Sequence, residues 1–250
     1  MVTGLDGGFG FERGDRVLVT GVGSGIGRAC AQIAAAQGLA VDGWDLDGEA
    51  AERVAAEIRE AGGEATSRVV DITDEGAIAA GMAALGAGPA VPRYLVNNAG
   101  PPSSAAMSFA EGIVAGAGSM EAVTRRWLEL DPPAMASVVF IASIAGNLTG
   151  AANDWYAGGK AAIAGYARRT AVAEAGRLRA NAVAPGLTET PRMKEFIAGE
   201  LGRQMIERIP LHRMGTPEDM GWTVVFLLSP RSAYITGQLV PVDGGLTIAP

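Results

Sequence analysis

A glycine-rich turn near the start of the chain constrains its fold more than any other feature. Residues 16–20 (RVLVT) are a short β-branched run that predicts a strand, and residues 28–37 carry apolar side chains at helical spacing. The sequence TGVGSGIG, residues 20–27, stands between them. Glycines in such a turn let the backbone approach a pyrophosphate, which then meets unpaired N–H groups at the helix N-terminus. The turn therefore predicts a dinucleotide site; the structural alternative is a tight turn in a chain rich in Ala and Gly.

The same alternation of strand and helix continues along the 250 residues. Further strands are predicted at residues 39–44, 65–70, 94–97, 137–142 and 180–183. Further helices are predicted at residues 49–61, 120–130, 156–174 and 217–228. Strands that alternate with helices imply right-handed connections and a parallel sheet. We therefore predict an α/β fold, a doubly wound Rossmann-type parallel sheet with helices on both faces, in a single domain.

Three segments are less regular. Residues 1–14 are predicted to be a loose N-terminal extension of a domain that occupies residues 15–250. Residues 101–118 show no clear period and are left unassigned. Residues 191–210 are bounded by prolines and carry apolar side chains at roughly helical spacing. They fit either a lid over a substrate or an amphipathic helix pair packed on the core, and we place a substrate segment near residues 191–212.

Composition narrows the class of partner. Apolar residues make up 48% of the chain and charged residues 19%, as in compact globular proteins, and the formal net charge is −7. Nucleic acids and anionic membranes bind basic surfaces, so this charge favours a small-molecule partner over either. Cys30 is the only cysteine, which excludes an intramolecular disulfide and fits a reducing, cytoplasmic setting. We also expect no secretion signal and no membrane span.

A tyrosine and a lysine provide the candidate chemistry. Tyr156 and Lys160 are four residues apart in a predicted helix, so they share one face. A phenol has a reference pKa of about 10, and proton exchange near neutrality needs a shift of about two to three units, which a nearby ammonium can supply. Ser143, at the end of a predicted strand, would donate to a substrate oxygen. Alone, the Tyr–Lys pair could be an ordinary surface pair on a helix.

The residue after the second predicted strand bears on the choice of dinucleotide. Asp45 closes that strand, where a carboxylate accepts hydrogen bonds from the ribose hydroxyls of adenosine and repels a 2′-phosphate. No Lys or Arg stands at residues 21–27 or 44–46 to bind that phosphate. The pattern predicts NAD as the cofactor rather than NADP. The alternative is that Asp45 is only a turn or N-cap residue before Asp47.

No pattern of residues predicts a metal site. His212 is the only histidine and follows Pro210-Leu211 in a predicted loop. One histidine and one cysteine cannot build an ordinary zinc site, although a carboxylate-rich site stays open. We expect His212 to be structural, or at most to face a substrate, and we assign no metal ligands.

Seven motifs in order resemble those of the classical short-chain dehydrogenase/reductase family, over residues 16–245. They are TGVGSGIG at 20–27, Asp71-Ile72, NNAG at 97–100, Ser143, Tyr156-x-x-x-Lys160, Pro185-Gly186 and ITGQLVPVDGG at 235–245. The resemblance implies a doubly wound domain with Ser143, Tyr156 and Lys160 as catalytic residues. It also implies contacts with the cofactor from Gly21, Ser24, Gly25, Ile26, Gly27, Asp45, Leu46, Asp71, Ile72, Asn98, Ala99, Gly100, Tyr156, Lys160, Pro185, Gly186, Thr188 and Thr190.

The resemblance assigns roles to some of these residues. It implies that the Asp71 carboxylate and the Ile72 backbone touch the adenine. It also implies that Thr190, with Thr188 near it, holds the nicotinamide carboxamide. Members of the family are commonly tetrameric, so we expect a homo-oligomer, a tetramer or dimer.

One motif of the family is missing. Its members usually carry an asparagine in the helix before the serine strand, where the kinked backbone holds water that connects the catalytic lysine to solvent. Here residues 115–119 read AGAGS, and Gly116 is the best match to that position. Two functions follow as alternatives. The first is an oxidoreductase that transfers hydride between NAD(H) and a secondary alcohol or ketone, with Tyr156 as general acid/base. The second is a noncatalytic dinucleotide-binding protein with an impaired proton relay. The intact Ser143, Tyr156 and Lys160 favour the first.

Overall fold

The computed structural model describes residues 8–249, apart from 151–152, 191–192 and 194–198. Within these residues one parallel sheet has the strand order β3-β2-β1-β4-β5-β6-β7. The strands are β1 Arg16–Thr20, β2 Ala40–Asp45, β3 Ala65–Val69, β4 Tyr94–Asn97, β5 Ala136–Ile141, β6 Leu178–Pro185 and β7 Leu239–Val242. The predicted doubly wound α/β fold in a single domain is confirmed.

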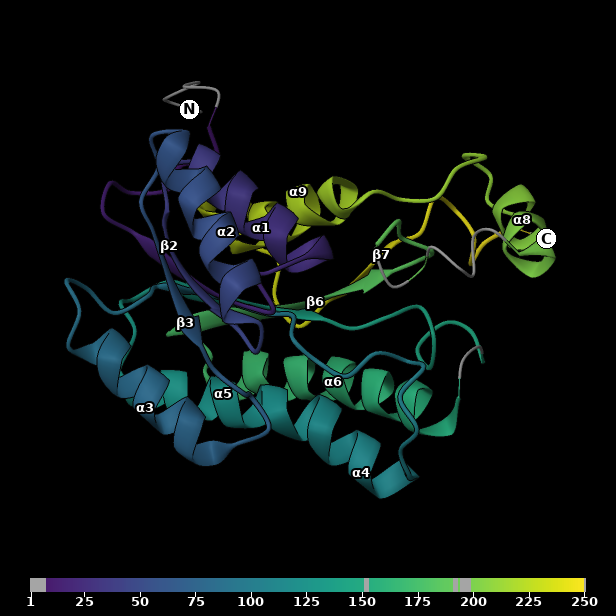
Figure 1. Cartoon of the computed structure of the whole chain (residues 1–250), viewed down its shortest axis with the longest axis horizontal. Coiled ribbons are helices and arrows are strands. Elements are labelled where there is room, and N and C mark those ends of the chain that lie inside the picture. The colour runs from purple at the N-terminus through teal and green to yellow at the C-terminus, as the bar shows by residue number, and fades with distance from the viewer. Residues whose placement is uncertain (1–7, 151–152, 191–192, 194–198, 250) are drawn as a thin grey trace.

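Helices cover both faces of the sheet. They are α1 Gly25–Ala36, α2 Gly48–Glu60, α3 Glu75–Gly86, α4 Phe109–Ile113, a π-helix at Val114–Gly118, α5 Ser119–Glu129, α6 Asp154–Ala173, α8 Glu200–Glu207, α9 Pro217–Leu228 and a 3-10 turn at Pro230–Ser232. α1, α2 and α9 lie on one face, and α3, α4, α5 and α6 lie on the other (Figure 1). α8 lies apart from both layers, close to the C-terminal end (Figure 1). None of the helices within the described ranges is long and apolar enough to cross a membrane.

Each face of the sheet buries its own apolar core. Trp44, Trp127 and Phe140 are buried beneath α3, α5 and α6, while Leu39 and Tyr94 are buried on the side of α1 and α9. Every residue of β1, β4, β5 and β6 is buried. Strands covered on both faces are rich in apolar residues, and the apolar stretch in each of these four predicts it from sequence.

The order of the strands reverses between β1 and β4. β1 pairs in parallel with β2 on one side and with β4 on the other. At such a switch point the connections leave toward opposite faces, and a crevice opens beyond the carboxyl ends of the strands. The glycine turn after β1 and the NNAG turn after β4 therefore meet at this edge.

The segment before β1 is packed where the structure describes it. The ring of Phe9 makes edge contacts with Phe11, Trp222 and Phe226, at centroid distances of 6.5, 6.1 and 6.1 Å. Phe11 meets Tyr94 of β4 at 5.2 Å. Edge-to-face aromatic pairs of this kind stabilise beyond their buried area. Phe9 and Phe11 thus pack on the domain, whereas residues 1–7 of the predicted loose extension lie outside the described residues, and the extension stays a prediction.

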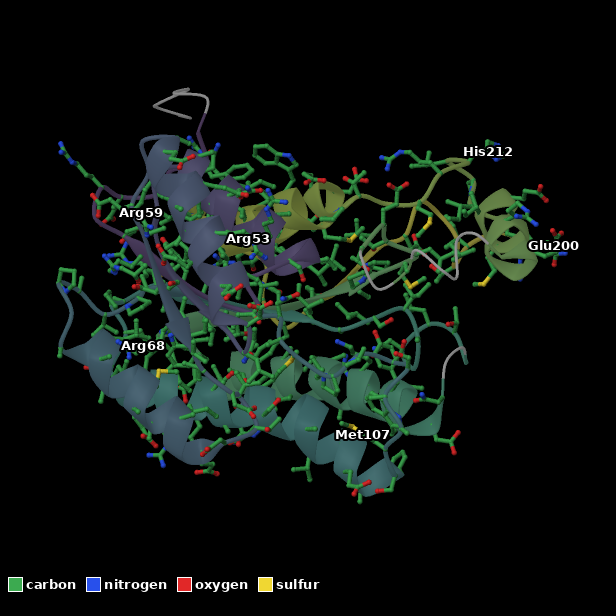
Figure 2. All side chains as sticks on the ribbon, in the orientation of Figure 1. Arg53, Arg59, Arg68, Met107, Glu200 and His212 are labelled. Carbon is green, nitrogen blue, oxygen red and sulfur yellow. The ribbon has the colours of Figure 1, made fainter. Side chains whose placement is uncertain are left out.

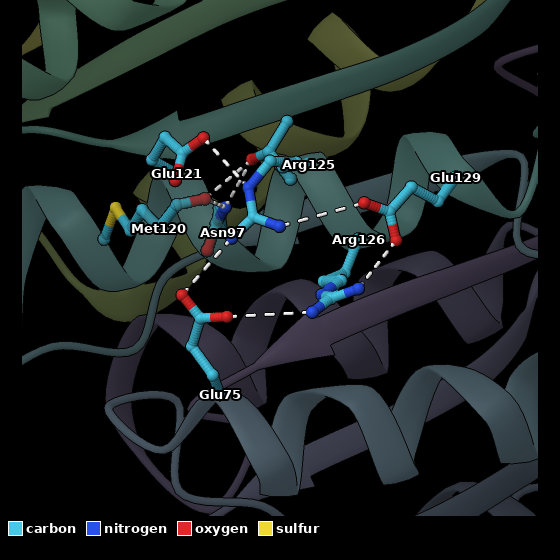
Figure 3. A network of polar contacts seen from close by, with 8 residues as sticks. Glu75, Asn97, Met120, Glu121, Arg125, Arg126 and Glu129 are labelled. Carbon is cyan, nitrogen blue, oxygen red and sulfur yellow. Dashed lines mark hydrogen bonds and ion pairs between the residues drawn. The ribbon is translucent and has the colours of Figure 1, made fainter.

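Surface ion pairs connect α3 and α5, on the face of the sheet opposite α1, α2 and α9. Figure 3 shows Glu75, at the start of α3, between Arg125 and Arg126 of α5, at 3.4 and 3.7 Å. Arg125 also lies 3.4 Å from Glu121 and 3.7 Å from Glu129 (Figure 3). Surface pairs of this kind contribute little each, because water screens them and long side chains must be ordered.

A buried arginine makes a stronger contribution. Arg179 of β6 is only 7% exposed, and its guanidinium donates to the carbonyls of Leu227, Leu228 and Ser229 at 2.8, 2.9 and 3.0 Å. These carbonyls lie at the C-terminal end of α9, where a helix has no internal donors and a cation is favoured. The same group donates to Ser232 Oγ and to the Ile235 carbonyl.

Replacing Arg179 with Met should lower the free energy of unfolding by about 3 kcal/mol or more, because several buried carbonyls lose their donor together. The matched control is Arg125→Met, which removes an arginine of partly exposed pairs and should cost about 1 kcal/mol or less. Urea-induced unfolding of both variants measures the difference. Equal losses would contradict the assignment of Arg179 as the cap of α9.

Candidate active site

The glycine turn and the NNAG turn are tied together by hydrogen bonds. Thr20 Oγ1, at the end of β1, accepts from the backbone N–H groups of Asn98 and Ala99 at 3.0 and 3.1 Å. The Asn98 side chain donates back to the carbonyls of Thr20 and Gly21 at 3.0 and 3.1 Å. These four bonds hold two turns that are far apart in sequence in one arrangement at the switch point.

The glycine turn has the shape of a phosphate cradle. Gly21 and Gly25 have φ angles of 68° and 54°, a region that favours glycine. A Cβ at Gly27 would overlap the carbonyl oxygen of Gly21, and one at Gly25 would lie 3.3 Å from Thr190 Cγ2. Ser24, the N-cap of α1, does not cap that helix with its side chain. Ser24, Gly25, Ile26 and Gly27 thus carry the N-terminal end of α1 into the crevice, and these residues fit a dinucleotide pyrophosphate.

Asp45 binds the glycine turn directly. Its Oδ2 accepts from the N–H of Gly23 at 2.8 Å, and its Oδ1 accepts from the N–H of Asp47 at 3.0 Å. The N-cap of α2 is Asp47, whose side chain accepts from Ala50 N–H, so Asp45 is not the cap. Its carboxylate lies where the turn, β2 and α2 meet. Leu46, next along the chain, is 69% exposed.

The other predicted cofactor residues lie at the carboxyl ends of further strands. Asp71 Oδ1 accepts from the N–H and hydroxyl of Thr73 at 2.8 and 2.7 Å, and Ile72 is buried. Pro185 ends β6, and Gly186 donates to the Val242 carbonyl at 3.0 Å.

Gly186, Thr188 and Thr190 follow one another along the segment after β6. The Thr188 hydroxyl donates to the Gly186 carbonyl at 3.1 Å. The Thr190 side chain lies against Gly25 of the glycine turn. The structure thus brings the segment after β6 against the turn after β1, while Asn98, Ala99 and Gly100 form the neighbouring turn.

Tyr156 and Lys160 lie on one face of α6. Tyr156 stands in the first turn of that helix, and Lys160 Nζ lies 5.6 Å from the centroid of the Tyr156 ring. Lys160 Nζ also donates to the carbonyl of Ile141, the last residue of β5, at 2.8 Å. A cation near a phenol favours its anion, and α6 holds this ammonium beside the ring of Tyr156. The spacing predicted from sequence therefore brings the two side chains together.

Ser143 lies two residues beyond β5 and is buried. Its Oγ accepts from the N–H of Ala145 at 3.1 Å, within the turn that follows the strand. Because one lone pair is used in this way, the hydroxyl hydrogen is what Ser143 can give to a substrate oxygen.

Sequence reasoning missed an asparagine that caps α6, the helix that carries Tyr156 and Lys160. Asn153 Oδ1 accepts from the Tyr156 N–H at 3.0 Å, and its Nδ2 donates to the Ser103 carbonyl at 2.7 Å. The cap therefore fixes the first turn of α6 and ties it to the loop after the NNAG turn. A signal was available, because asparagine immediately before a helical run is a preferred N-cap.

The segment that lacks the family asparagine forms a π-helix at Val114–Gly118, between α4 and α5. The single hydroxyl hydrogen of Ser119 is shared between the carbonyls of Ala115 and Gly116, which lie 2.7 and 2.9 Å from its Oγ. A π-turn widens a helix by one residue, and such turns are frequent at functional sites. Gly116 thus lies in an opened turn even though no asparagine stands there.

Glycines bring α4 close to α6. A Cβ at Gly112 would lie 2.6 Å from the Trp155 side chain, and one at Gly158 would lie 2.7 Å from Phe109. These contacts place the helix that carries Tyr156 against the segment of residues 101–118, which the sequence left unassigned.

His212 and Cys30 take no part in this arrangement. His212 is exposed, has a φ of 51° and lies beside α8 at the outer end of the molecule (Figure 2). Cys30 is buried in α1, and burial raises the pKa of its thiol to about 12, so it is not an activated nucleophile. The parts of the chain that the structure describes hold no cluster of three His, Cys, Asp or Glu side chains that could bind a metal ion.

The chain is similar to known proteins over almost its whole length. A family model described as Enoyl-(Acyl carrier protein) reductase matches residues 21–247. The 3-oxoacyl-(acyl-carrier-protein) reductase FabG of Thermotoga maritima is 32% identical over 92% of this chain and 97% of its own. The (3R)-3-hydroxyacyl-CoA dehydrogenase of Rattus norvegicus is 35% identical over 92% of this chain and 95% of its own. The structure of the Pseudomonas aeruginosa RhlG/NADP active-site complex has a TM-score of 0.86 at 28% identity, covering 94% of this chain and 97% of that one.

Proposed function

The chain belongs to the short-chain dehydrogenase/reductase family, and on that basis we propose that it is an oxidoreductase transferring a hydride between NAD(H) and a secondary alcohol or ketone. The observation that carries the proposal is the position of the Lys160 ammonium, 5.6 Å from the Tyr156 ring and bonded to the end of β5. A protein that only bound a dinucleotide would gain nothing from a phenol held beside a cation.

The chain's own residues supply the proton and the orientation. In the direction of oxidation, the Tyr156 phenolate takes the hydroxyl proton while the carbinol carbon loses a hydride; reduction of a ketone is the reverse. Lys160 stabilises that phenolate, and Ser143 donates to the substrate oxygen and fixes its approach. When bound, the nicotinamide ring supplies the carbon that accepts or gives the hydride.

The preference for NAD rests on Asp45. Its carboxylate is fixed by the N–H groups of Gly23 and Asp47, at the place where the glycine turn meets β2. A fixed anion there can accept from ribose hydroxyls and repels a 2′-phosphate. RhlG, to which this chain is similar, is described with NADP. The preference for NAD is therefore inferred from the residues of this chain alone.

The proposal also covers the oligomeric state of the protein and its cellular location. Phe109 and Val114, on α4 and the π-helix, are 57% and 70% exposed, and Val172 near the end of α6 is 75% exposed. Exposed apolar side chains on the helices of one face suit contact with another copy. We therefore include in the proposal a homo-oligomer, a tetramer or dimer, that acts on small molecules in the cytoplasm.

The alternative is a noncatalytic dinucleotide-binding protein with an impaired proton relay. The observation in its favour is the Ala-Gly segment in place of the family asparagine. The π-helix at Val114–Gly118 weakens that alternative, because the helix is opened at this point without the asparagine side chain.

Replacing Tyr156 with Phe should remove turnover, because the ring stays in place while the exchangeable proton is lost. The measurement is a panel of alcohols and ketones followed at the nicotinamide absorbance with NAD and with NADP. Cofactor binding, followed by fluorescence titration, should stay within about threefold of the unchanged protein. Near-normal turnover by Tyr156→Phe would remove this residue from its role.

Replacing Asp45 with Arg should raise the ratio of kcat/KM for NADP to that for NAD by about tenfold or more, because an anion that repels the 2′-phosphate becomes a cation that binds it. Glu60→Arg, at the exposed end of α2, is the control with the same change of charge. An unchanged ratio, or an equal rise in the control, would count against Asp45 as the determinant.

Placing Asn at Gly116 should leave turnover intact or increase it. A Cβ at Gly116 would have no atom within 4 Å, so the substitution introduces no clash at that carbon. Initial rates with the best substrate of the panel measure the effect. Complete loss of turnover in a folded Gly116→Asn protein would show that residue 116 does not correspond to the position of the family asparagine.

A further inference from the structure

A side-chain amide connects the turn after β5 to the helix of the candidate catalytic pair. Asn147 Nδ2 donates to the carbonyl of Ser143 and to the carbonyl of Lys160, both at 3.0 Å. Both neighbours are carbonyl oxygens, so only the NH₂ end of the amide satisfies them, and both of its hydrogens are used. One group thus joins the backbone of Ser143 to that of Lys160, which lies 13 residues beyond Asn147 in sequence.

The turn that carries Asn147 is itself tightly folded. The N–H groups of Asn147, Leu148 and Thr149 all point to the carbonyl of Ile144, at 3.2, 2.8 and 3.0 Å. Gly146 has a φ of 76°, and a Cβ there would overlap the carbonyl oxygen of Ala157 in α6. The turn therefore touches α6 backbone to backbone, and the amide closes the contact from one side.

We propose that Asn147 is a positioning residue that sets the place of the Ser143 hydroxyl relative to Tyr156 and Lys160. The inference rests on the proposed function for the roles of those three residues. α6 is long and anchored at its start by Asn153, whereas the turn after β5 is short. Loss of the amide therefore displaces the turn, and with it Ser143, more than it displaces Lys160.

The consequence is a selective loss of rate. Ser143 donates to the substrate oxygen. When its hydroxyl shifts, that oxygen is no longer correctly placed for proton exchange with the phenol of Tyr156. A misplacement of about 1 Å costs about 100-fold in rate, which sets the upper limit for a shift of this kind. The hydrogen bonds of Asn147 to the described residues go to Ser143, Ile144 and Lys160 rather than to the glycine turn at residues 20–27, so binding of NAD is expected to be unaffected.

The first test uses two variants and a matched control. In Asn147→Ala both donors are lost; in Asn147→Asp the shape is kept, but an anion faces two carbonyl oxygens. Both should lower kcat by about 10- to 100-fold and enlarge the primary isotope effect with a carbon-deuterated alcohol. The NAD dissociation constant should stay within about twofold.

The control is Asn181→Ala. Asn181 likewise joins two segments by its side-chain amide, donating to the Ile235 carbonyl at 2.9 Å and accepting from Gln238 N–H at 3.0 Å; it is buried, whereas Asn147 is half-buried. Its loss should lower the melting temperature without changing kcat or the isotope effect. If Asn147 had only a structural role, its variants would behave like this control, with a lower melting temperature and an unchanged kcat and isotope effect.

A second readout needs no turnover. Hydrogen exchange of the amides of residues 144–149, in the protein without added cofactor, should be up to about tenfold faster in Asn147→Ala, because the turn loses one of its anchors. In a Ser143→Ala background, Asn147→Ala should have little further effect on rate, because it acts through Ser143.

Wild-type kcat and isotope effect in both Asn147 variants, or unchanged exchange, would overturn the inference. A full additional loss in the Ser143→Ala background would overturn it as well. The proposed function fails separately, if Tyr156→Phe keeps its turnover. Loss of turnover in Tyr156→Phe together with normal Asn147 variants would leave that function standing and remove this inference alone.

Discussion

The candidate site depends on how closely α6 approaches the end of β5. A Cβ at Gly146 would overlap the Ala157 carbonyl, and one at Gly158 would press on Phe109, so glycines permit the contact on two sides of the helix. Lys160 then reaches the Ile141 carbonyl with its ammonium. A helix held at a greater distance would present the same Tyr156 and Lys160 side chains, but away from the strand end that carries Ser143.

A second constraint places this arrangement beside the cofactor cradle. The reversal of strand order between β1 and β4 opens a crevice at the carboxyl ends of the strands, and β5 lies next to β4 in the same sheet. The turns after β1 and β4 are bound to each other through Thr20 and Asn98. The glycine turn and the arrangement of Ser143, Tyr156 and Lys160 therefore share one edge, because the sheet is parallel and ordered in this way.

The sequence predicts those elements and contacts that depend on residues close together along the chain. β1 and β4 are continuous apolar runs, and their predicted bounds match the structure; the shared face of Tyr156 and Lys160 follows from helical spacing alone. α3 was missed because Glu75–Gly86 is dominated by Ala and Gly with little periodicity, although Asp74 caps its start. Asn147 gave no signal, since its two acceptors come together only in the folded chain. Of the predicted segment at 191–210, residues 191–192 and 194–198 lie outside the described residues, and α8 occupies its later part.

The sequence lacks the asparagine that members of the family usually carry, but the helix is still irregular at that position. At Val114–Gly118 the backbone opens into a π-turn, and the hydroxyl of Ser119 binds two of its carbonyls. Side chains that bond carbonyls of the preceding turn compete with the regular ladder and bend helices. Small residues at 115–118 allow the widened turn to lie against α6. The irregular backbone therefore arises here from glycine, alanine and one serine, so the absence of an asparagine does not by itself argue against an active enzyme.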